Sequence, residues 1–124
     1  MTNRIKDVAV RVQRLDATVG ELSISVFPDR LTNGTEVHGR VTGPHCAGAT
    51  TVEVSYPLQE TSRQDDKEGD PCIRSRVVIP EPNLWDPISP FVYQCKLELW
   101  QGDQRCDQTE RLIQLKAPRK EGGP

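Results

Sequence analysis

The sequence predicts an all-β fold, an immunoglobulin-like antiparallel β-sandwich of about seven strands, and three observations support this prediction. Val and Ile together outnumber Leu two to one, and β-branched side chains pack well on a pleated sheet. Ten Pro and nine Gly divide the 124 residues into short pieces, and no segment shows the apolar stripe of a helix. Apolar and polar residues instead alternate with a period of two, which is typical of sheets with one buried face.

Seven stretches with this alternation predict the strands in order. They lie at about residues 5–14, 20–28, 35–42, 49–57, 72–80, 91–100 and 105–116. Successive side chains of a strand point to opposite faces, so every second residue is expected in the core. The expected core positions are Val8, Val10, Val12, Leu22, Ile24, Val26, Val37, Val41, Val52, Val54, Tyr56, Ile73, Val77, Ile79, Phe91, Tyr93, Cys95, Leu97, Leu99, Ile113 and Leu115.

The segments between the strands contain turn-forming and charged residues. Residues 59–71 are expected to form a charged loop, and residues 80–90 form a loop with four prolines. The strands make one domain of ordinary size over residues 5–116. A short N-terminal lead at residues 1–4 precedes this domain, and a loose tail at residues 117–124 follows it.

The composition excludes several classes of protein. The chain has 16 Lys and Arg against 18 Asp and Glu, and its isoelectric point is near 5.7. The isoelectric point of a nucleic-acid-binding domain usually exceeds about 9. The longest aliphatic run, Val77–Ile79, is far too short to cross a membrane, and residues 1–4 open no secretory signal. We therefore expect no nucleic-acid or membrane partner and a cytoplasmic location.

The proline-rich loop carries a predicted structural plug. Its prolines restrict φ and lower the entropy of the free loop, while Trp85 offers a large apolar surface and one hydrogen-bond donor. We expect Trp85, together with Pro90 and Tyr93, to cover an open end of the sandwich. The indole N–H should then donate to a backbone carbonyl. Stacking of Trp85 on a ligand is the alternative.

The four cysteines are expected to be free thiols. Tyr93-Gln94-Cys95 is a Tyr-x-Cys triplet, in which immunoglobulin domains place a corner tyrosine and a cysteine that bridges to the second strand. The predicted second strand contains no cysteine, so this bridge cannot form. Among the other pairs only Cys72 and Cys106 could approach, and they are expected on different sheets.

Trp100 is a candidate contact residue. It follows the inward-facing Leu99 directly, so its side chain should be exposed at the end of the strand over residues 91–100. An exposed indole with polar neighbours is typical of a contact with another domain or a second copy of the chain. Binding of a glycan to Trp100 is the alternative.

No residue pattern indicates catalysis, a metal or a cofactor. The acidic residues fall on loops and outward-facing positions, where solvated surface charge is the ordinary interpretation. The acidic run over residues 65–70 lacks the spacing of a calcium loop. His38 and His45 lie seven residues apart, and the cysteines lack the Cys-x-x-Cys spacing of a zinc site. We expect no catalytic residue, no metal and no cofactor in this chain.

Three segments carry a resemblance to a known family. They are Val-Ile-Pro-Glu-Pro-Asn-Leu-Trp at 78–85, Pro-Phe-Val-Tyr at 90–93 and Leu-Glu-Leu at 97–99. They resemble the end of the immunoglobulin-like domain of family 2 glycoside hydrolases, the β-galactosidases, β-glucuronidases and β-mannosidases. The opening residues 5–10 are similar to the start of that domain. Residues 113–116, however, lack the glycine, aromatic residue and arginine with which the family often ends it.

The resemblance implies a non-catalytic accessory domain in carbohydrate metabolism. In such enzymes the domain is a spacer between a sugar-binding jelly-roll domain and a catalytic barrel. These flanking domains, or a second copy of the chain, are the expected partners. The alternative function is a stand-alone protein- or glycan-binding module of fibronectin-like kind, and an independent enzyme is a third.

Overall fold

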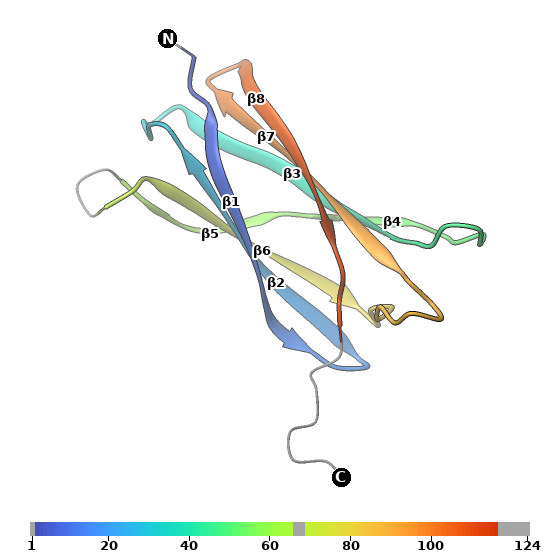
Figure 1. The fold of residues 1–124 in the computed structure, drawn as a ribbon. Coiled ribbons are helices and arrows are strands. Elements are labelled where there is room, and N and C mark those ends of the chain that lie inside the picture. Colours follow the sequence, from blue (N-terminus) through green and yellow to red (C-terminus); the bar gives the residue numbers. More distant parts are fainter. Residues whose placement is uncertain (1, 66–68, 117–124) are drawn as a thin grey trace.

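The computed structural model describes residues 2–65 and 69–116, which form two antiparallel sheets (Figure 1). The strand orders are β1-β2-β6-β5 in one sheet and β4-β3-β7-β8 in the other. The strands are β1 (Ile5–Leu15), β2 (Val19–Pro28), β3 (Thr35–His45), β4 (Val54–Pro57), β5 (Gln59–Gln64), β6 (Cys72–Pro80), β7 (Val92–Gln101) and β8 (Gln104–Ile113). The predicted β-sandwich is confirmed. The described part of the chain has no helix that is long and apolar enough to span a membrane.

The core lies between the two sheets and is mainly aliphatic. Most of the expected inward positions are buried in it. The buried ones are Leu22, Ile24, Val26, Val41, Ile73, Val77, Ile79, Tyr93, Cys95, Leu97, Leu99, Ile113 and Leu115. Removal of this apolar surface from water is the main stabilising contribution. No inter-sheet disulfide joins the layers, since all four cysteines are free.

The strand predicted over residues 49–57 exists but covers only its last four residues, and the prediction of a charged loop from residue 59 is wrong because residues 59–64 form a strand. The chain instead forms two short strands, β4 and β5, which belong to different sheets. Pro57 has no N–H with which to continue the pairing of β4 with β3, and the chain crosses to the other sheet after it. The polar β5 is a strand because its backbone pairs with β6 at a sheet edge. Its side chains can stay in water there, so an apolar pattern is not required.

Two of the three core positions expected in the segment before Pro57 are exposed in the structure. Tyr56 packs against the core, but Val52 and Val54 are 85% and 46% exposed. Val52 lies outside any strand, and Val54 pairs only with Gly43 at the edge of the sheet. A short edge strand covers little of the opposite layer, which leaves these two valines uncovered.

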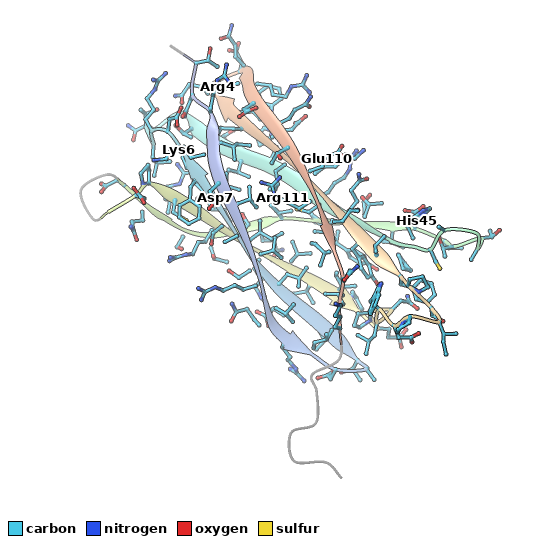
Figure 2. All side chains as sticks on the ribbon, in the orientation of Figure 1. Arg4, Lys6, Asp7, His45, Glu110 and Arg111 are labelled. Carbon is cyan, nitrogen blue, oxygen red and sulfur yellow. The ribbon has the colours of Figure 1, made fainter. Side chains whose placement is uncertain are left out.

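The edge strand β8 turns polar residues toward the inside of the sandwich. Asp107, Thr109 and Arg111 lie opposite inward-facing residues of β7 in the strand register. Figure 2 shows Arg111 on the side of β8 that faces β1 and Glu110 on the other side. Inward-pointing charges of this kind prevent an edge strand from pairing with another chain. These polar side chains also leave part of β1 uncovered. Val12 of β1, an expected core residue, is therefore 47% exposed.

Polar groups connect the N-terminal segment to the sandwich. The Asn3 side chain is buried, and its amide donates to the backbone oxygen of Arg30 (2.8 Å) and accepts from the Arg30 N–H (3.1 Å). The Ile5 N–H donates to Asp107 Oδ2 at 2.9 Å, which links β1 to β8 across the two sheets. The predicted tail at residues 117–124 lies outside the described residues.

Candidate functional site

The predicted plug lies where β7 begins, and Tyr93 is its buried member. The Tyr93 hydroxyl accepts a hydrogen bond from the backbone N–H of Asn83 at 3.0 Å. This is the corner hydrogen bond that the Tyr-x-Cys triplet implies. The Tyr93 ring also lies close to β3, since a Cβ placed on Gly43 would be 2.7 Å from its Cδ1 atom. Tyr93 thereby holds the proline-rich loop against the sandwich.

Trp85 is half-buried and is attached to the segment that follows β8. Its backbone N–H donates to the Leu115 oxygen at 2.8 Å, and the ammonium of Lys116 lies 4.7 Å from the ring centroid. This distance is that of a cation–π contact. The expectation for the indole N–H is wrong, because it has no hydrogen-bond partner in residues 2–65 and 69–116. The backbone N–H makes the contact with a carbonyl instead.

The other residues of this loop divide into covered and exposed positions. Leu84 packs against the core cluster, whereas Pro90 is exposed. Of the three predicted plug residues, Tyr93 is therefore buried, Trp85 is half-buried and Pro90 lies at the surface. The role of Trp85 as a plug stays a prediction, and Leu84 is a core contact that the sequence analysis did not single out.

Trp100 lies near the other end of β7, on the outer face of its sheet. Its ring stacks on that of His38 in β3, with centroids 5.1 Å apart and planes at 28°. Its Nε1 donates to Glu98 Oε1 at 3.1 Å. The outward direction was predicted correctly, but Trp100 is half-buried rather than fully exposed. The difference arises because His38 covers one side of the indole.

Glu98 holds the Trp100 ring in place. Its second oxygen, Oε2, accepts from Arg105 Nη1 at 3.0 Å, so both carboxylate oxygens are engaged. The hydrogen bond from Trp100 and then that from Arg105 lower the pKa of Glu98 below its usual value. Glu98 is therefore ionised at neutral pH, and Trp100, Glu98, Arg105 and His38 form one connected group.

A groove of about 560 Å³ lies beside this group on the outer face of β3, β7 and β8. Its outward-facing side chains are paired in the strand register, such as His38 with Glu98, Arg40 with Lys96 and Lys96 with Glu110. The full lining is His38, Gly39, Arg40, Lys96, Leu97, Glu98, Gln108, Thr109 and Glu110. This volume lies within the range of roughly 300–1,000 Å³ found for ligand sites, but the lining is largely polar.

The histidines lie apart in the structure, and each has its own acidic neighbour. His38 Nε2 is 3.1 Å from Glu36 Oε2, and His45 Nδ1 is 3.7 Å from Glu53 Oε2. Across the ranges 2–65 and 69–116, no three His, Cys, Asp or Glu side chains gather as they would around a metal ion. Part of the acidic run over residues 65–70 lies outside those ranges.

The four cysteines are free, and they differ in accessibility. Cys46, Cys72 and Cys95 are buried, and Cys106 is partly exposed. Burial raises the pKa of the Cys95 thiol to about 11, against a smaller opposing effect of Arg111. A thiol with this pKa is almost entirely protonated at neutral pH and is a poor nucleophile.

Sequence reasoning found Trp100 and placed Arg105 near it, but it missed His38 and Glu98 as neighbours. His38 was considered only as a metal ligand, and Glu98, Arg40 and Lys96 were taken as ordinary solvated residues. The signal that links them is the register between β3 and β7, which places His38 opposite Glu98 and Arg40 opposite Lys96. Alternation alone gives the face on which a residue lies, but not its neighbour on the next strand.

Comparisons with known proteins agree with this sandwich. The family model described as glycosyl hydrolases family 2 matches residues 3–113. The chain belongs to glycosyl hydrolases family 2. No curated protein sequence matches it significantly.

Solved structures of glycosidases share the fold. A β-glucuronidase of Bifidobacterium dentium, in complex with coumarin-3-O-glucuronide, matches 92% of this chain with a TM-score of 0.62 and 16% identity. A family 2 member from Bacteroides cellulosilyticus matches 91% with a TM-score of 0.59 and 16% identity. A β-glycosidase from Bacteroides vulgatus matches 92% with a TM-score of 0.57 and 14% identity. The matched regions are 18%, 14% and 13% of those chains, respectively, so this chain spans a small part of each.

Proposed function

We propose that this chain is a non-catalytic scaffolding domain, which in a family 2 glycosidase holds a sugar-binding domain and a barrel domain in a fixed relation. One observation carries the proposal. The family match covers the sandwich from residue 3 to residue 113, and the same sandwich makes up only 13–18% of the solved enzymes described above. A module that is so small a part of each enzyme suits a spacer better than a catalytic unit.

The chemistry of the groove supports a non-catalytic role. Hydrolysis of a glycoside needs a carboxylic acid that keeps its proton at the working pH and a second carboxylate. Glu98, the acidic residue beside Trp100, has a lowered pKa and is bonded through both oxygens. Glu110, the other acidic residue of the groove, accepts from Gln94 Nε2 at 2.9 Å. The bonding of Glu98 opposes the protonation that a general acid requires.

The face around Trp100 is the proposed surface for the neighbouring domain. Its indole is held by Glu98 and stacked on His38, so the geometry of the contact residue is fixed before a partner arrives. A preorganised contact loses less side-chain entropy on association. The same aromatic pair also favours a second candidate function, that of a stand-alone protein- or glycan-binding module of fibronectin-like kind.

Two experiments test the proposal. In the first, the purified chain is incubated with nitrophenyl β-galactoside, β-glucuronide and β-mannoside, and no release above buffer is expected. Turnover that disappears when Glu98 or Glu110 is replaced by Gln would contradict the proposal. A trace of contaminating enzyme is recognised because its turnover would be unchanged in both variants.

The second experiment separates scaffolding from glycan binding. Titration of galactosides, glucuronides and mannosides should leave the fluorescence of the wild-type chain unchanged. The Trp100→Ala variant should remain within about 1 kcal/mol of wild type in stability, since an outer-face residue contributes little to the core. It should weaken any self-association seen by sedimentation. A saturable glycan signal that Trp100→Ala abolishes would favour the glycan-binding module.

A further inference from the structure

An Asn-Gly pair lies at the tip of the connection between β2 and β3. Asn33 and Gly34 are the two central residues of a turn, which is closed by a hydrogen bond from the Thr35 N–H to the Thr32 oxygen at 3.1 Å. The Asn33 side chain is exposed. Gly34 has no Cβ, so its backbone nitrogen is open to approach by the side chain that precedes it. A carboxamide therefore lies next to an unhindered backbone nitrogen.

Neither of these two groups is held by a hydrogen bond. Within the part of the chain that the structure describes, the Asn33 carboxamide and the Gly34 N–H have no hydrogen-bond partner. The other two asparagines of the chain differ. Asn3 is buried and bonded through both amide atoms. Asn83 is exposed, but it precedes Leu84, a bulky residue that packs against the core. Asn33 is thus the asparagine best placed to react with its own main chain.

We propose that Asn33 is a site of spontaneous deamidation, which converts it to isoaspartate and aspartate with water as the co-reactant. The Gly34 nitrogen attacks Cγ of Asn33, the new N–Cγ bond closes a cyclic succinimide, and the Cγ–Nδ2 bond breaks. The Gly34 N–H proton leaves with the amide nitrogen as ammonia. Water then opens the ring at Cγ, which gives aspartate, or at the main-chain carbonyl carbon, which gives isoaspartate. The reaction is independent of the proposed scaffolding function.

The same residues also have the Asn-x-Thr order of an N-glycosylation acceptor. The folded chain does not present this motif as a whole, because Thr35 is fully buried and its hydroxyl donates to Gln101 Oε1 at 2.8 Å. Deamidation needs only Asn33 and Gly34, which lie at the accessible tip of the turn. The observations therefore favour deamidation.

The product alters the end of the sandwich that carries Trp100. An isoaspartyl linkage adds one methylene group to the main chain directly before Gly34, whose oxygen accepts from the Gly102 N–H at 2.8 Å. Thr35, the next residue, is the register partner of Gln101, which directly follows Trp100. The longer main chain should therefore displace the start of β3 from the end of β7, and the reaction adds a carboxylate at the same place.

The experiment incubates the full 124-residue chain at pH 6 and at pH 8 for several weeks, followed by tryptic digestion and mass spectrometry. Asn33 is the only Asn or Gln in the tryptic peptide of residues 31–40, so a mass gain from replacement of NH₂ by OH in that peptide belongs to it. The gain should be faster at pH 8, because the Gly34 nitrogen attacks after it loses its proton. Fragmentation that cleaves the Cα–Cβ bond should reveal isoaspartate beside aspartate. A sample digested at time zero corrects for reaction during the digestion.

Two controls separate this reaction from general ageing of the protein. Asn83 is the internal control, since it is as accessible as Asn33 but precedes leucine, and it should react much more slowly in the same sample. Gly34→Ala is the matched variant. Gly34 does not have a positive φ, and a Cβ there would first meet the movable end of the Gln101 side chain at 3.1 Å, so the fold should be kept. The variant should deamidate about tenfold more slowly, because the Cβ hinders the attacking nitrogen.

Several outcomes would overturn the proposal. Equal rates at Asn33 and Asn83 would do so, as would equal rates in wild type and Gly34→Ala. A product that is aspartate alone would exclude the succinimide, since direct hydrolysis of the side-chain amide gives no isoaspartate. In ¹⁵N spectra, unchanged amide signals of Gln101 and Gly102 in the isoaspartate fraction would refute the effect on the ends of β3 and β7.

Discussion

Gly39 lies in the middle of β3, and its replacement by Ala tests how closely β3 and β7 pack below the groove. A Cβ on Gly39 would lie 2.6 Å from the Lys96 backbone oxygen and 3.0 Å from Leu97 Cδ2. The carbonyl is part of the strand pairing and cannot move alone, so the two strands must separate slightly. Overpacking of this kind typically costs about 1–3 kcal/mol. We expect a loss of about 2 kcal/mol, or about 8 °C in Tm for a domain of this size.

Gly20→Ala is the matched control for this prediction. A Cβ on Gly20, a buried residue of β2, would lie 3.5 Å from Leu15 and Pro82, which is ordinary contact. The alanine also reduces the entropy of the unfolded chain, so stability should stay level or rise by about 0.4–1 kcal/mol. Urea unfolding followed by tryptophan fluorescence measures both variants. A Gly39→Ala variant as stable as Gly20→Ala would refute the close approach of the strands.

Three further predictions concern the loop, the thiols and a surface turn. Trp85→Ala should lower the free energy of unfolding by about 2 kcal/mol, roughly half the cost of losing a fully buried aromatic residue, because Trp85 is half-buried; an unchanged urea midpoint would contradict this. Reducing agent should leave Tm unchanged, because the four cysteines are free thiols. Iodoacetamide at pH 8, followed by mass spectrometry, should alkylate Cys106 first and the buried Cys95 last. A thiol count below four in the unfolded, non-reduced chain would contradict the assignment of free thiols. The hydroxyl and N–H of Thr18 hold the pKa of Asp16 well below its usual range, so the folded state favours the carboxylate. The contribution of the Asp16 carboxylate to stability is therefore present above about pH 4 and is lost as the pH falls further. The difference in unfolding free energy between wild type and Asp16→Asn should become smaller as the pH is lowered from 6 to 2. A constant difference over this range would show that protonation of Asp16 does not affect the stability of the turn.

The sequence predicted the sandwich well wherever strands are buried on one face. Leu22, Ile24 and Val26 of β2 and the alternating residues of β7 are fully buried, as expected. These strands are central in their sheets, and each inward side chain meets the opposite layer. A period of two is strongest in such strands because the two faces differ most in exposure to water.

The prediction was weaker at the edges of the sheets. β5 has a polar sequence, and inward positions of β8 carry Asp107, Thr109 and Arg111. Edge strands are held by backbone pairing on one side, and polar residues on them prevent association with other chains. Their sequences therefore lack the apolar alternation from which a strand is predicted.

The sequence by itself determined the fold class, the family and the direction of most side chains, because these depend on local alternation and on short motifs. It placed Tyr93 inward and Trp100 outward, and both directions agree with the structure. Only the tertiary structure decided which residues meet across strands. The His38–Trp100 stack and the Arg40–Lys96 pair depend on the register between β3 and β7, which are separated by about fifty residues along the chain. That register is set by the packing of the whole core, including the close approach at Gly39, and no local pattern encodes it.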